Sequence, residues 1–236
     1  MKWQIDQLKR TVPLMIAEGH AAELLAKIGR RLYSDRHSYL LARDMTVPFV
    51  APKGKVPIVV RPVRSIDHAA ILREIPTRLP ALQAGLATCY VATCGDGEVC
   101  YMQWLIDSSQ NALLERTFAG LCPPLRPGEG LLEWAYTFTK FRGLGIMADA
   151  MSQICTFGAA AGIRSILTFV DVDNVSSLRG CRSAGFRPAR RRIERWRLLQ
   201  SQVAFENLPE GAKFPFEDRT TDPTPSERSV EMDPKR

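Results

Sequence analysis

Hydrophobic residues recur along this chain with two different periods, which predict strands and helices in alternation. Continuous or alternating apolar runs predict strands over 58–63, 87–93, 98–106, 131–139, 165–172 and 187–199. Helical spacing predicts helices over 68–74, over about 145–161 and directly after Asn174. The resulting order, β-α-β-β-β-α-β-α-β, indicates a mixed α/β domain in which helices cover one sheet.

Turn residues mark the ends of several predicted elements. Gly95-Asp96-Gly97 lies between two strand-like runs, which is a strong hairpin signal. Ser65 or Asp67 can cap the first helix, and Gly162 follows the helix of 145–161 as a C′ glycine does. Residues 107–132 are ambiguous because they contain several proline and glycine breakers; their length could hold a short helix and a substrate-facing loop.

The two ends of the chain differ in character from its middle. Residues 1–30 have helical spacing interrupted by Pro13, which predicts packing on the core or in a homodimer. Residues 30–45 are basic and aromatic; we interpret them as a solvated face, with an acceptor cover or a nucleic-acid contact as alternatives. The tail from about Phe214 lacks the apolar surface that offsets ordering entropy. We therefore predict a helical, basic extension (1–55), a folded domain (56–200) and a largely disordered tail (201–236).

Composition narrows the class of protein. The chain has 236 residues, of which 45% are apolar, enough for one domain with a core. Its net charge of +7 favours anionic partners, nucleic acid among them. No 18-residue apolar run is present and the first residues do not resemble a signal peptide, so we expect a cytoplasmic protein without a membrane span.

The six cysteines show no metal-binding spacing. They stand at 89, 94, 100, 122, 155 and 181, without paired Cys-x-x-Cys motifs, so we expect reduced thiols and no metal site. Cys94 and Cys100 flank the predicted hairpin turn, but we do not favour a disulfide between them.

A glycine-rich turn follows the predicted strand 131–139. The segment Arg142-Gly143-Leu144-Gly145-Ile146-Met147 opens the next helix. A helix N-terminus presents unpaired N–H groups and a partial positive charge, and glycine allows close approach, so such a turn can hold a phosphate or pyrophosphate. A strand-to-helix turn without a ligand is the alternative.

This turn and a second motif resemble the GNAT acyltransferase superfamily. Arg142 and Gly145 match its acyl-CoA loop, and Met147 stands where the family usually has glycine or alanine. Downstream, Asn174 and Gly185-Phe186 fall on family positions, and Cys181 stands where the family has a tyrosine. The resemblance covers roughly residues 57–199.

The resemblance implies an acyl-CoA N-acyltransferase fold, with a central mixed, mostly antiparallel sheet flanked by helices and a splay between two central strands. It also implies acetyl transfer from acetyl-CoA to a primary amine by direct attack in a ternary complex. Asn174 would hydrogen-bond the pantetheine, cap its helix, or do both. The implied cofactor-binding residues are Thr137, Phe138, Thr139, Arg142, Gly143, Leu144, Gly145, Ile146, Met147, Asn174 and Ser177.

Three residues are candidates for the chemistry. Glu133 is the one carboxylate in an apolar strand, and partial burial would raise its pKa toward that of a general base. A solvent-facing or arginine-paired Glu133 is the alternative. Tyr136 is a second candidate, but it shares a face with Glu133 only if a bulge intervenes, as in the family. Cys181 is a candidate acid or acylated nucleophile, or simply a small core residue.

Some alternatives to this function stay open. Eight arginines between residues 179 and 197 form a basic run, of which Arg191, Arg195 and Arg197 should share one face; they would meet the CoA 3′-phosphate, an acidic acceptor or solvent. A non-catalytic acyl-CoA sensor or interaction module and a longer-chain N-acyl amino acid synthase are the rival functions. A nucleic-acid binder is disfavoured because no reading motif is present.

Overall fold

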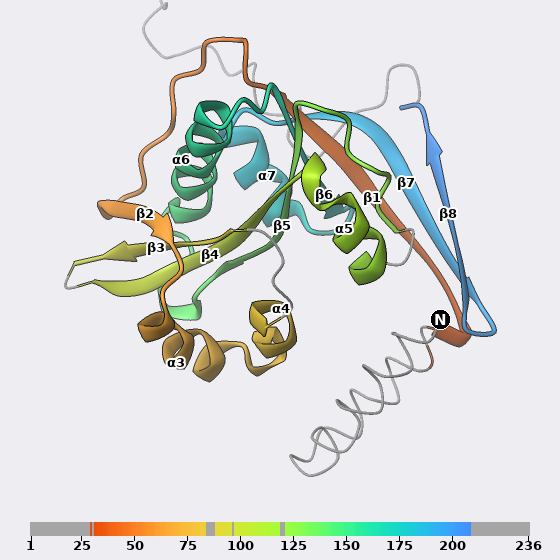
Figure 1. Ribbon diagram of the computed structural model, residues 1–236, viewed down its shortest axis with the longest axis horizontal. Coiled ribbons are helices and arrows are strands. Elements are labelled where there is room, and N and C mark those ends of the chain that lie inside the picture. The colour runs from red at the N-terminus through yellow and green to blue at the C-terminus, as the bar shows by residue number, and fades with distance from the viewer. Residues whose placement is uncertain (1–28, 30, 84–87, 96, 119–120, 209–236) are drawn as a thin grey trace, which may run out of the picture.

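One eight-stranded sheet forms the centre of the molecule, with the strand order β2-β3-β4-β5-β6-β1-β7-β8 (Figure 1). The computed structural model describes residues 29, 31–83, 88–95, 97–118 and 121–208. β5 and β6 are parallel, and all other neighbouring strands are antiparallel, so the predicted mixed, mostly antiparallel sheet is confirmed. The strands are β1 (Tyr33–Asp44), β2 (Ile58–Pro62), β3 (Cys89–Cys94), β4 (Glu98–Asp107), β5 (Glu129–Thr137), β6 (Ser165–Asp171), β7 (Arg187–Arg197) and β8 (Gln200–Glu206).

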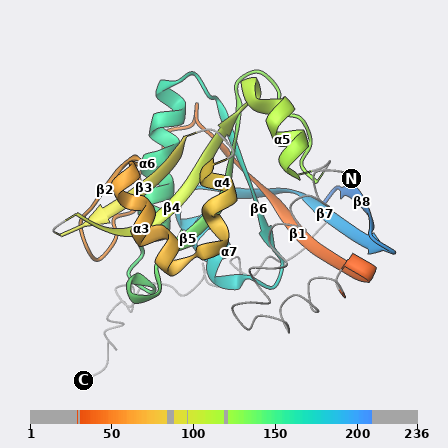
Figure 2. The ribbon, with the colours of Figure 1, turned by 60° about the horizontal axis from the view of Figure 1, so that its bottom comes forward.

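Helices cover both faces of the sheet (Figures 1 and 2). One hydrophobic core lies between the sheet and the pair α6 (Ile146–Ala160) and α7 (Val175–Ser183). A second core lies on the opposite face under α3 (Ser65–Glu74), α4 (Leu79–Gln83) and α5 (Asn111–Phe118). Short 3₁₀ turns at Pro76–Arg78, Ser108–Gln110 and Thr139–Phe141 connect these elements.

The strand β1 was not predicted, and it lies inside the sheet between β6 and β7. The sequence did not predict it because its first half is polar and charged. In the structure these charges are paired with residues on the neighbouring strands. Arg36 forms an ion pair with Asp171 on β6 at 2.7 Å, and Asp35 forms one with Arg197 on β7 at 2.7 Å. Its second half is apolar, and Leu41 is fully buried. Residues 33–44 therefore belong to the folded sheet, whereas the predicted helix over 1–30 lies largely outside the described residues.

The strand β8 replaces the first part of the predicted disordered tail. It pairs antiparallel with β7, and the two strands are joined by a turn at Leu198 and Leu199. Both leucines have positive φ, 48° and 68°. Turns of this kind are normally signalled by asparagine or glycine, so this hairpin had no recognisable sequence signature. The rest of the tail, residues 209–236, lies outside the described residues.

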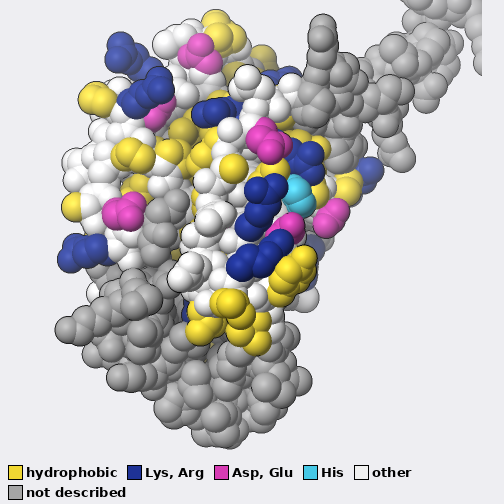
Figure 3. Space-filling view, turned by 90° about the vertical axis from the view of Figure 1, so that its right-hand side faces the viewer, with side chains coloured by type: hydrophobic (Ala, Val, Ile, Leu, Met, Phe, Trp, Pro, Cys, Tyr) yellow, Lys and Arg dark blue, Asp and Glu magenta, His cyan; other side chains and the backbone are white. Residues whose placement is uncertain are grey.

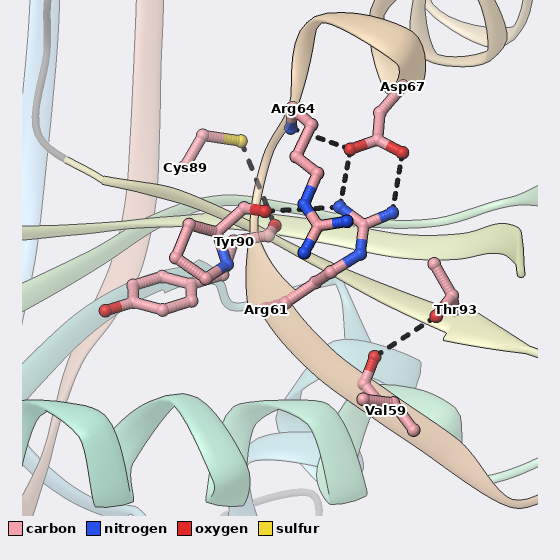
Figure 4. A network of polar contacts seen from close by, with 8 residues as sticks. Val59, Arg61, Arg64, Asp67, Cys89, Tyr90 and Thr93 are labelled. Carbon is pink, nitrogen blue, oxygen red and sulfur yellow. Dashed lines mark hydrogen bonds and ion pairs between the residues drawn. The ribbon is translucent and has the colours of Figure 1, made fainter.

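A buried carboxylate fixes the start of α3 (Figure 4). Asp67 is 4% exposed and accepts two hydrogen bonds from the Arg61 guanidinium, at 2.7 and 2.8 Å. It also accepts the backbone N–H of Arg64 at 2.7 Å, which satisfies a donor at the helix N-terminus. The guanidinium of Arg61 lowers the pKa of Asp67. The Arg61–Asp67 contact therefore joins β2 to α3, in the helical layer on this face of the sheet.

Candidate active site

The glycine turn has the geometry of an anion site. Gly143 and Gly145 both lie in the left-handed region, with φ of 76° and 75°, and Gly145 is the N-cap of α6. Within the described chain, the backbone N–H groups of Gly145, Ile146, Met147 and Ala148 donate no hydrogen bond. These donors and the positive end of the α6 dipole face the same opening.

A strap from Thr46 to Pro57, between β1 and β2, packs on this turn. Its residue Gly54 donates its N–H to the buried carboxylate of Asp149 on α6 at 2.9 Å, and Lys55 N–H donates to the Leu144 carbonyl at 2.8 Å. A Cβ at Gly145 would lie 3.6 Å from the Gly54 Cα, an ordinary contact, so its positive φ and not a lack of space favours glycine at this position. The strap thereby forms one wall of the site.

A cleft of about 740 Å³ lies between this turn, the end of β5 and α7. Three of its lining side chains are cationic, Lys53, Arg142 and Arg179, and none is a carboxylate. Such a lining suits a ligand with several negative charges. The lining comprises Pro52, Lys53, Tyr101, Ala135, Tyr136, Thr137, Phe141, Arg142, Gly143, Gly145, Ile146, Met147, Ala148, Asn174, Ser176, Ser177, Arg179, Gly180 and Ser183.

Most of the predicted cofactor-binding residues come together in this cleft. Those that line it are Thr137, Arg142, Gly143, Gly145, Ile146, Met147, Asn174 and Ser177. Three others do not: Phe138 is buried, Thr139 bonds to Glu74, and Leu144 supports the strap. Whether these residues bind a cofactor stays a prediction.

Sequence reasoning missed parts of the cleft wall. Ser176, Gly180 and Ser183 stand with Arg179 on one face of α7, a spacing that was available in the sequence once Asn174 was taken as the cap. The Asn174 side chain does cap this helix, accepting the Ser177 N–H at 3.2 Å. No sequence pattern marked Lys53 as a cleft residue, because only the path of the strap in the folded protein brings it there.

Met147 and Gly180 are a matched pair across the two helices. A Cβ on Gly180 would lie 2.9 Å from the Met147 sulfur. The missing side chain on α7 therefore makes room for the bulky residue on α6. This explains how the chain accommodates methionine where the GNAT family usually has a small residue.

β5 and β6 separate at the head of the cleft. Their pairing ends at Leu132 and Thr168, and beyond this point β5 pairs only with β4 while β6 pairs only with β1. The resemblance predicted such a splay. It leaves the end of β5 without a hydrogen-bonded neighbour on the side of β6.

A bulge in β5 brings Glu133 and Tyr136 to one face. Glu133 stands opposite Trp104 and Tyr136 opposite Met102, so β5 has one extra residue here. Trp134 takes up the bend with a φ of 55°, a conformation that non-glycine residues rarely adopt. Trp104 and Met102 both belong to the core on the α3–α5 face. Glu133 therefore lies beside the splay on this face, not in the cleft.

Glu133 has an environment that favours its protonated form. The side chain is partly exposed, yet enough protein surrounds the carboxylate that desolvation raises its pKa to about 7. The guanidinium groups of Arg192 and Arg78 act in the opposite direction. Arg192 Nε donates a hydrogen bond to Ser38 Oγ at 2.9 Å. The guanidinium carbon of Arg78 lies 5.6 Å from the Trp134 ring centroid. A carboxylate of this pKa exchanges protons near neutral pH.

Tyr136 connects the glycine turn to α3. Arg142 Nη2 donates to its hydroxyl oxygen at 3.2 Å, and the hydroxyl donates to Glu74 Oε1 at 3.3 Å. Glu74 also accepts the N–H and hydroxyl of Thr139, and these hydrogen bonds lower the pKa of Glu74. Tyr136 is the predicted catalytic residue that directly lines the cleft.

Cys181 lies on the buried face of α7 and points into the core. It is 1% exposed, and burial raises the pKa of its thiol to about 12. It does not line the cleft. Nearby Tyr101 does line it, although its hydroxyl is turned inward and donates to Gln103 Oε1 at 2.7 Å.

The basic run on β7 carries paired charges. The predicted common face of Arg191, Arg195 and Arg197 follows from the alternation of the strand. Arg191 lies 3.0 Å from His37 Nδ1, and Arg197 pairs with Asp35. Figure 3 shows acidic side chains among the basic ones on this side of the molecule. No helix in the described part of the chain has the length and apolar character needed to cross a membrane.

Comparisons with known proteins identify the fold. No protein-family model matches the sequence, and a sequence comparison with curated proteins finds no match. Among solved structures, a GCN5-related N-acetyltransferase from Sphaerobacter thermophilus matches with a TM-score of 0.50 and 17% identity, over 75% of this chain and 57% of that one. A GNAT family acetyltransferase from Novosphingobium aromaticivorans matches with a TM-score of 0.49 and 17% identity, over 75% and 66%.

The first of these likenesses shows that the chain has the fold of a GNAT acetyltransferase. The fold expected from the two sequence motifs is thereby confirmed. The matched regions span less than two thirds of the solved chains' own length. At 17% identity the comparison establishes the fold and not the reaction.

Proposed function

We propose that this protein is an N-acyltransferase that transfers the acetyl group of acetyl-CoA to a primary amine. One observation carries the proposal: the cleft at the glycine turn is lined by Lys53, Arg142 and Arg179 without a carboxylate. The pyrophosphate of CoA would bind the free N–H groups of α6. The pantetheine arm would follow β5 to the splay.

The transfer would be direct. The amine enters from the α3–α5 face and its nitrogen attacks the thioester carbonyl carbon, while Glu133 takes a proton from the amine. A backbone N–H near the β5 bulge would stabilise the oxyanion of the tetrahedral intermediate. The C–S bond then breaks, the amide is released, and the CoA thiolate takes a proton from water in the cleft.

Cys181 is a poor source for that last proton. A thiol whose pKa is about 12 gives up its proton less readily than an ordinary thiol of pKa about 8.5. Full burial also separates it from a ligand in the cleft. We propose that Cys181 packs the core, so that Cys181→Ala retains acetyl transfer at near wild-type rate. A rate loss of about 100-fold in a folded variant would assign Cys181 the acid role instead.

Thermal unfolding with and without acetyl-CoA tests the binding step. At about 100 times its dissociation constant, a ligand adds about 2.7 kcal/mol, enough to raise the midpoint by several degrees. Arg142→Gln and Arg179→Gln should each weaken binding about tenfold, because each removes a charge-assisted contact. Arg116→Gln, on the exposed side of α5, is the matched control. A folded protein without any shift would refute the proposal.

Turnover distinguishes the enzyme from its rival. Release of the CoA thiol in the presence of a panel of primary amines, with acyl chains of two to about twelve carbons, reports the acceptor and the preferred acyl group. Binding without turnover on every amine would instead establish a non-catalytic acyl-CoA-binding module. Preference for long chains would favour the N-acyl amino acid synthase alternative.

A further inference from the structure

A second pocket, of about 810 Å³, lies at the opposite end of β6 from the cleft. The last residues of β1, the first residues of β6 and β7, and the beginning of the strap form its walls. It shares no lining residue with the cleft. Its lining comprises Ala42, Arg43, Asp44, Thr46, Val47, Pro48, Phe49, Arg164, Ser165, Gly185, Arg187, Pro188 and Ala189.

The charge in this pocket is predominantly positive and unneutralised. Three arginines, Arg43, Arg164 and Arg187, and one carboxylate, Asp44, line it. Arg187 Nη1 donates to the carbonyls of Phe186 and Arg182, at 2.9 and 3.3 Å, which leaves its charge unpaired. One oxygen of that carboxylate, Oδ1, accepts the N–H and hydroxyl of Thr46 at 2.8 and 2.7 Å. In the described part of the chain, none of the three arginines forms an ion pair.

Arg43 is the deepest of the three cations. It is 8% exposed, and its Nη1 donates to the carbonyl of Ala184 at the end of α7, at 2.9 Å. Its Nε is buried without a hydrogen-bond partner. A buried donor that lacks an acceptor is costly, and a buried cation more so. Arg43 therefore places a buried positive charge, without a carboxylate partner, behind the wall of the pocket.

The other walls are apolar and rigid. The guanidinium carbon of Arg43 lies 4.3 Å from the centroid of the Phe49 ring. The ring also lies against Gly185, where a Cβ would come within 2.9 Å of it, so glycine is required at this contact. Val47, Pro48 and Pro188 give the pocket exposed aliphatic surface next to the cations. An anionic head with an apolar body matches both parts.

We propose that this pocket binds a small organic anion through a carboxylate or phosphate group. The head group would bind the exposed Arg164 and Arg187 in the bidentate geometry that guanidinium favours, and the charge of the buried Arg43 would add to the attraction. The body would cover Val47, Pro48 and Pro188. The site is separate from the acyl-CoA cleft and does not depend on the proposed acyltransferase activity.

Calorimetric titration of the full chain with phenyl phosphate and with hexanoate tests this inference. Saturable binding of at least one of them with a dissociation constant below about 1 mM, together with little binding of neutral hexanamide, is expected. The two anions distinguish a phosphate head from a carboxylate head. Arg164→Gln and Arg187→Gln should each weaken binding about tenfold, whereas the matched Arg116→Gln should not. Arg43 is left unchanged because it also caps α7.

Three results would overturn the inference. Neither anion binding at about 5 mM would exclude a site of useful affinity. Equal binding of hexanamide would show an apolar surface without anion recognition. Loss of binding in Arg142→Gln, with no loss in Arg164→Gln, would place the anion in the acyl-CoA cleft.

Discussion

At the scale of single residues, the bulge residue Trp134 decides what Glu133 can do. Its positive φ turns Glu133 toward the α3–α5 face, among aromatic and apolar side chains that raise the carboxyl pKa. Strained backbone at such a point is typical of functional sites. The pH dependence of Glu133 therefore follows from its placement in the bulge.

We predict that Glu133→Gln abolishes the pH dependence of acetyl transfer. In the wild type, kcat/KM should rise through pH of about 7, because only the deprotonated carboxylate accepts the amine proton. The variant should lose about 10² to 10³ in rate and show no such rise. Rate profiles between pH 5.5 and pH 9 with saturating acetyl-CoA are the measurement. An unchanged profile would assign the base to another group.

The same substitution has an independent effect on stability. Because the folded-state pKa of Glu133 is raised, the folded protein binds more protons between the ordinary pKa of 4.5 and about 7, so this group favours folding at low pH and loses that contribution as pH rises to about 7. Glu133→Gln should therefore gain stability relative to the wild type between pH 5 and pH 8. Urea unfolding at the two pH values checks the sign without any substrate.

A second residue-scale prediction concerns the contact between Met147 and Gly180. Gly180→Ala should leave the fold intact, because alanine favours a helix by about 1 kcal/mol over glycine. The new Cβ would displace the Met147 side chain, 2.9 Å away, toward the cleft and weaken acetyl-CoA binding. Adding Met147→Ala should restore affinity. Calorimetry on the two single variants and the double variant checks this; additive losses would refute the steric coupling.

At the scale of elements, the β7–β8 hairpin stores strain in its turn. Leu198 and Leu199 adopt positive φ, and Leu198 is 80% exposed, so no core packing explains its presence. Their N–H groups donate to the carbonyls of Leu32 and Arg31, each at 2.9 Å, which anchors the turn next to the start of β1. The backbone contacts, not the side chains, hold this turn in place.

We predict that Leu198→Asn with Leu199→Gly stabilises the protein. Asparagine and glycine adopt positive φ at little cost, so the pair should raise the free energy of unfolding by about 1–2 kcal/mol. Chemical denaturation is the measurement. Leu198→Ala with Leu199→Ala is the control, because it removes the same exposed side chains but keeps the Cβ atoms that disfavour positive φ. A decrease in stability would show that the leucine side chains make contacts that matter.

At the scale of the whole molecule, β1 is the element that closes the sheet. It pairs with β6 over Ser38–Asp44 and with β7 over Tyr33–Ala42. Without it, β6 and β7 would have no strand between them, and the hairpin β7–β8 would lose its attachment to the sheet. The core on the α6–α7 face would also lose Leu41.

A pair of truncations tests this role of β1. A chain of residues 46–236 should fail to unfold cooperatively, because it loses the pairings of β1 with both β6 and β7. A chain of residues 29–236 keeps β1 and separates its contribution from that of residues 1–28. Circular dichroism during thermal unfolding is the measurement. A cooperative transition in the 46–236 chain would show that residues 33–44 are dispensable for folding.

The sequence by itself determined the parts of this protein that rest on local periodicity and turn chemistry. Runs of apolar residues located β2, β3, β4, β5, β6 and β7, and glycine at 143, 145 and 162 located the bounds of α6. The two motifs at 142–147 and 174–186 indicated the GNAT fold through their resemblance to that superfamily. The signals for single strands and helices are local, because each depends on residues a few positions apart.

Only the tertiary structure decided where polar segments belong. The charges of β1 are satisfied by Asp171 and Arg197, which lie more than 130 residues away, so no local pattern marks it as a strand. Lys53 and Phe49 reach their pockets through the path of the strap. The three pocket arginines come from β1, from the residue before β6 and from β7. The bulge at Trp134 likewise depends on pairing with β4. Long-range pairing, not intrinsic preference, placed these residues.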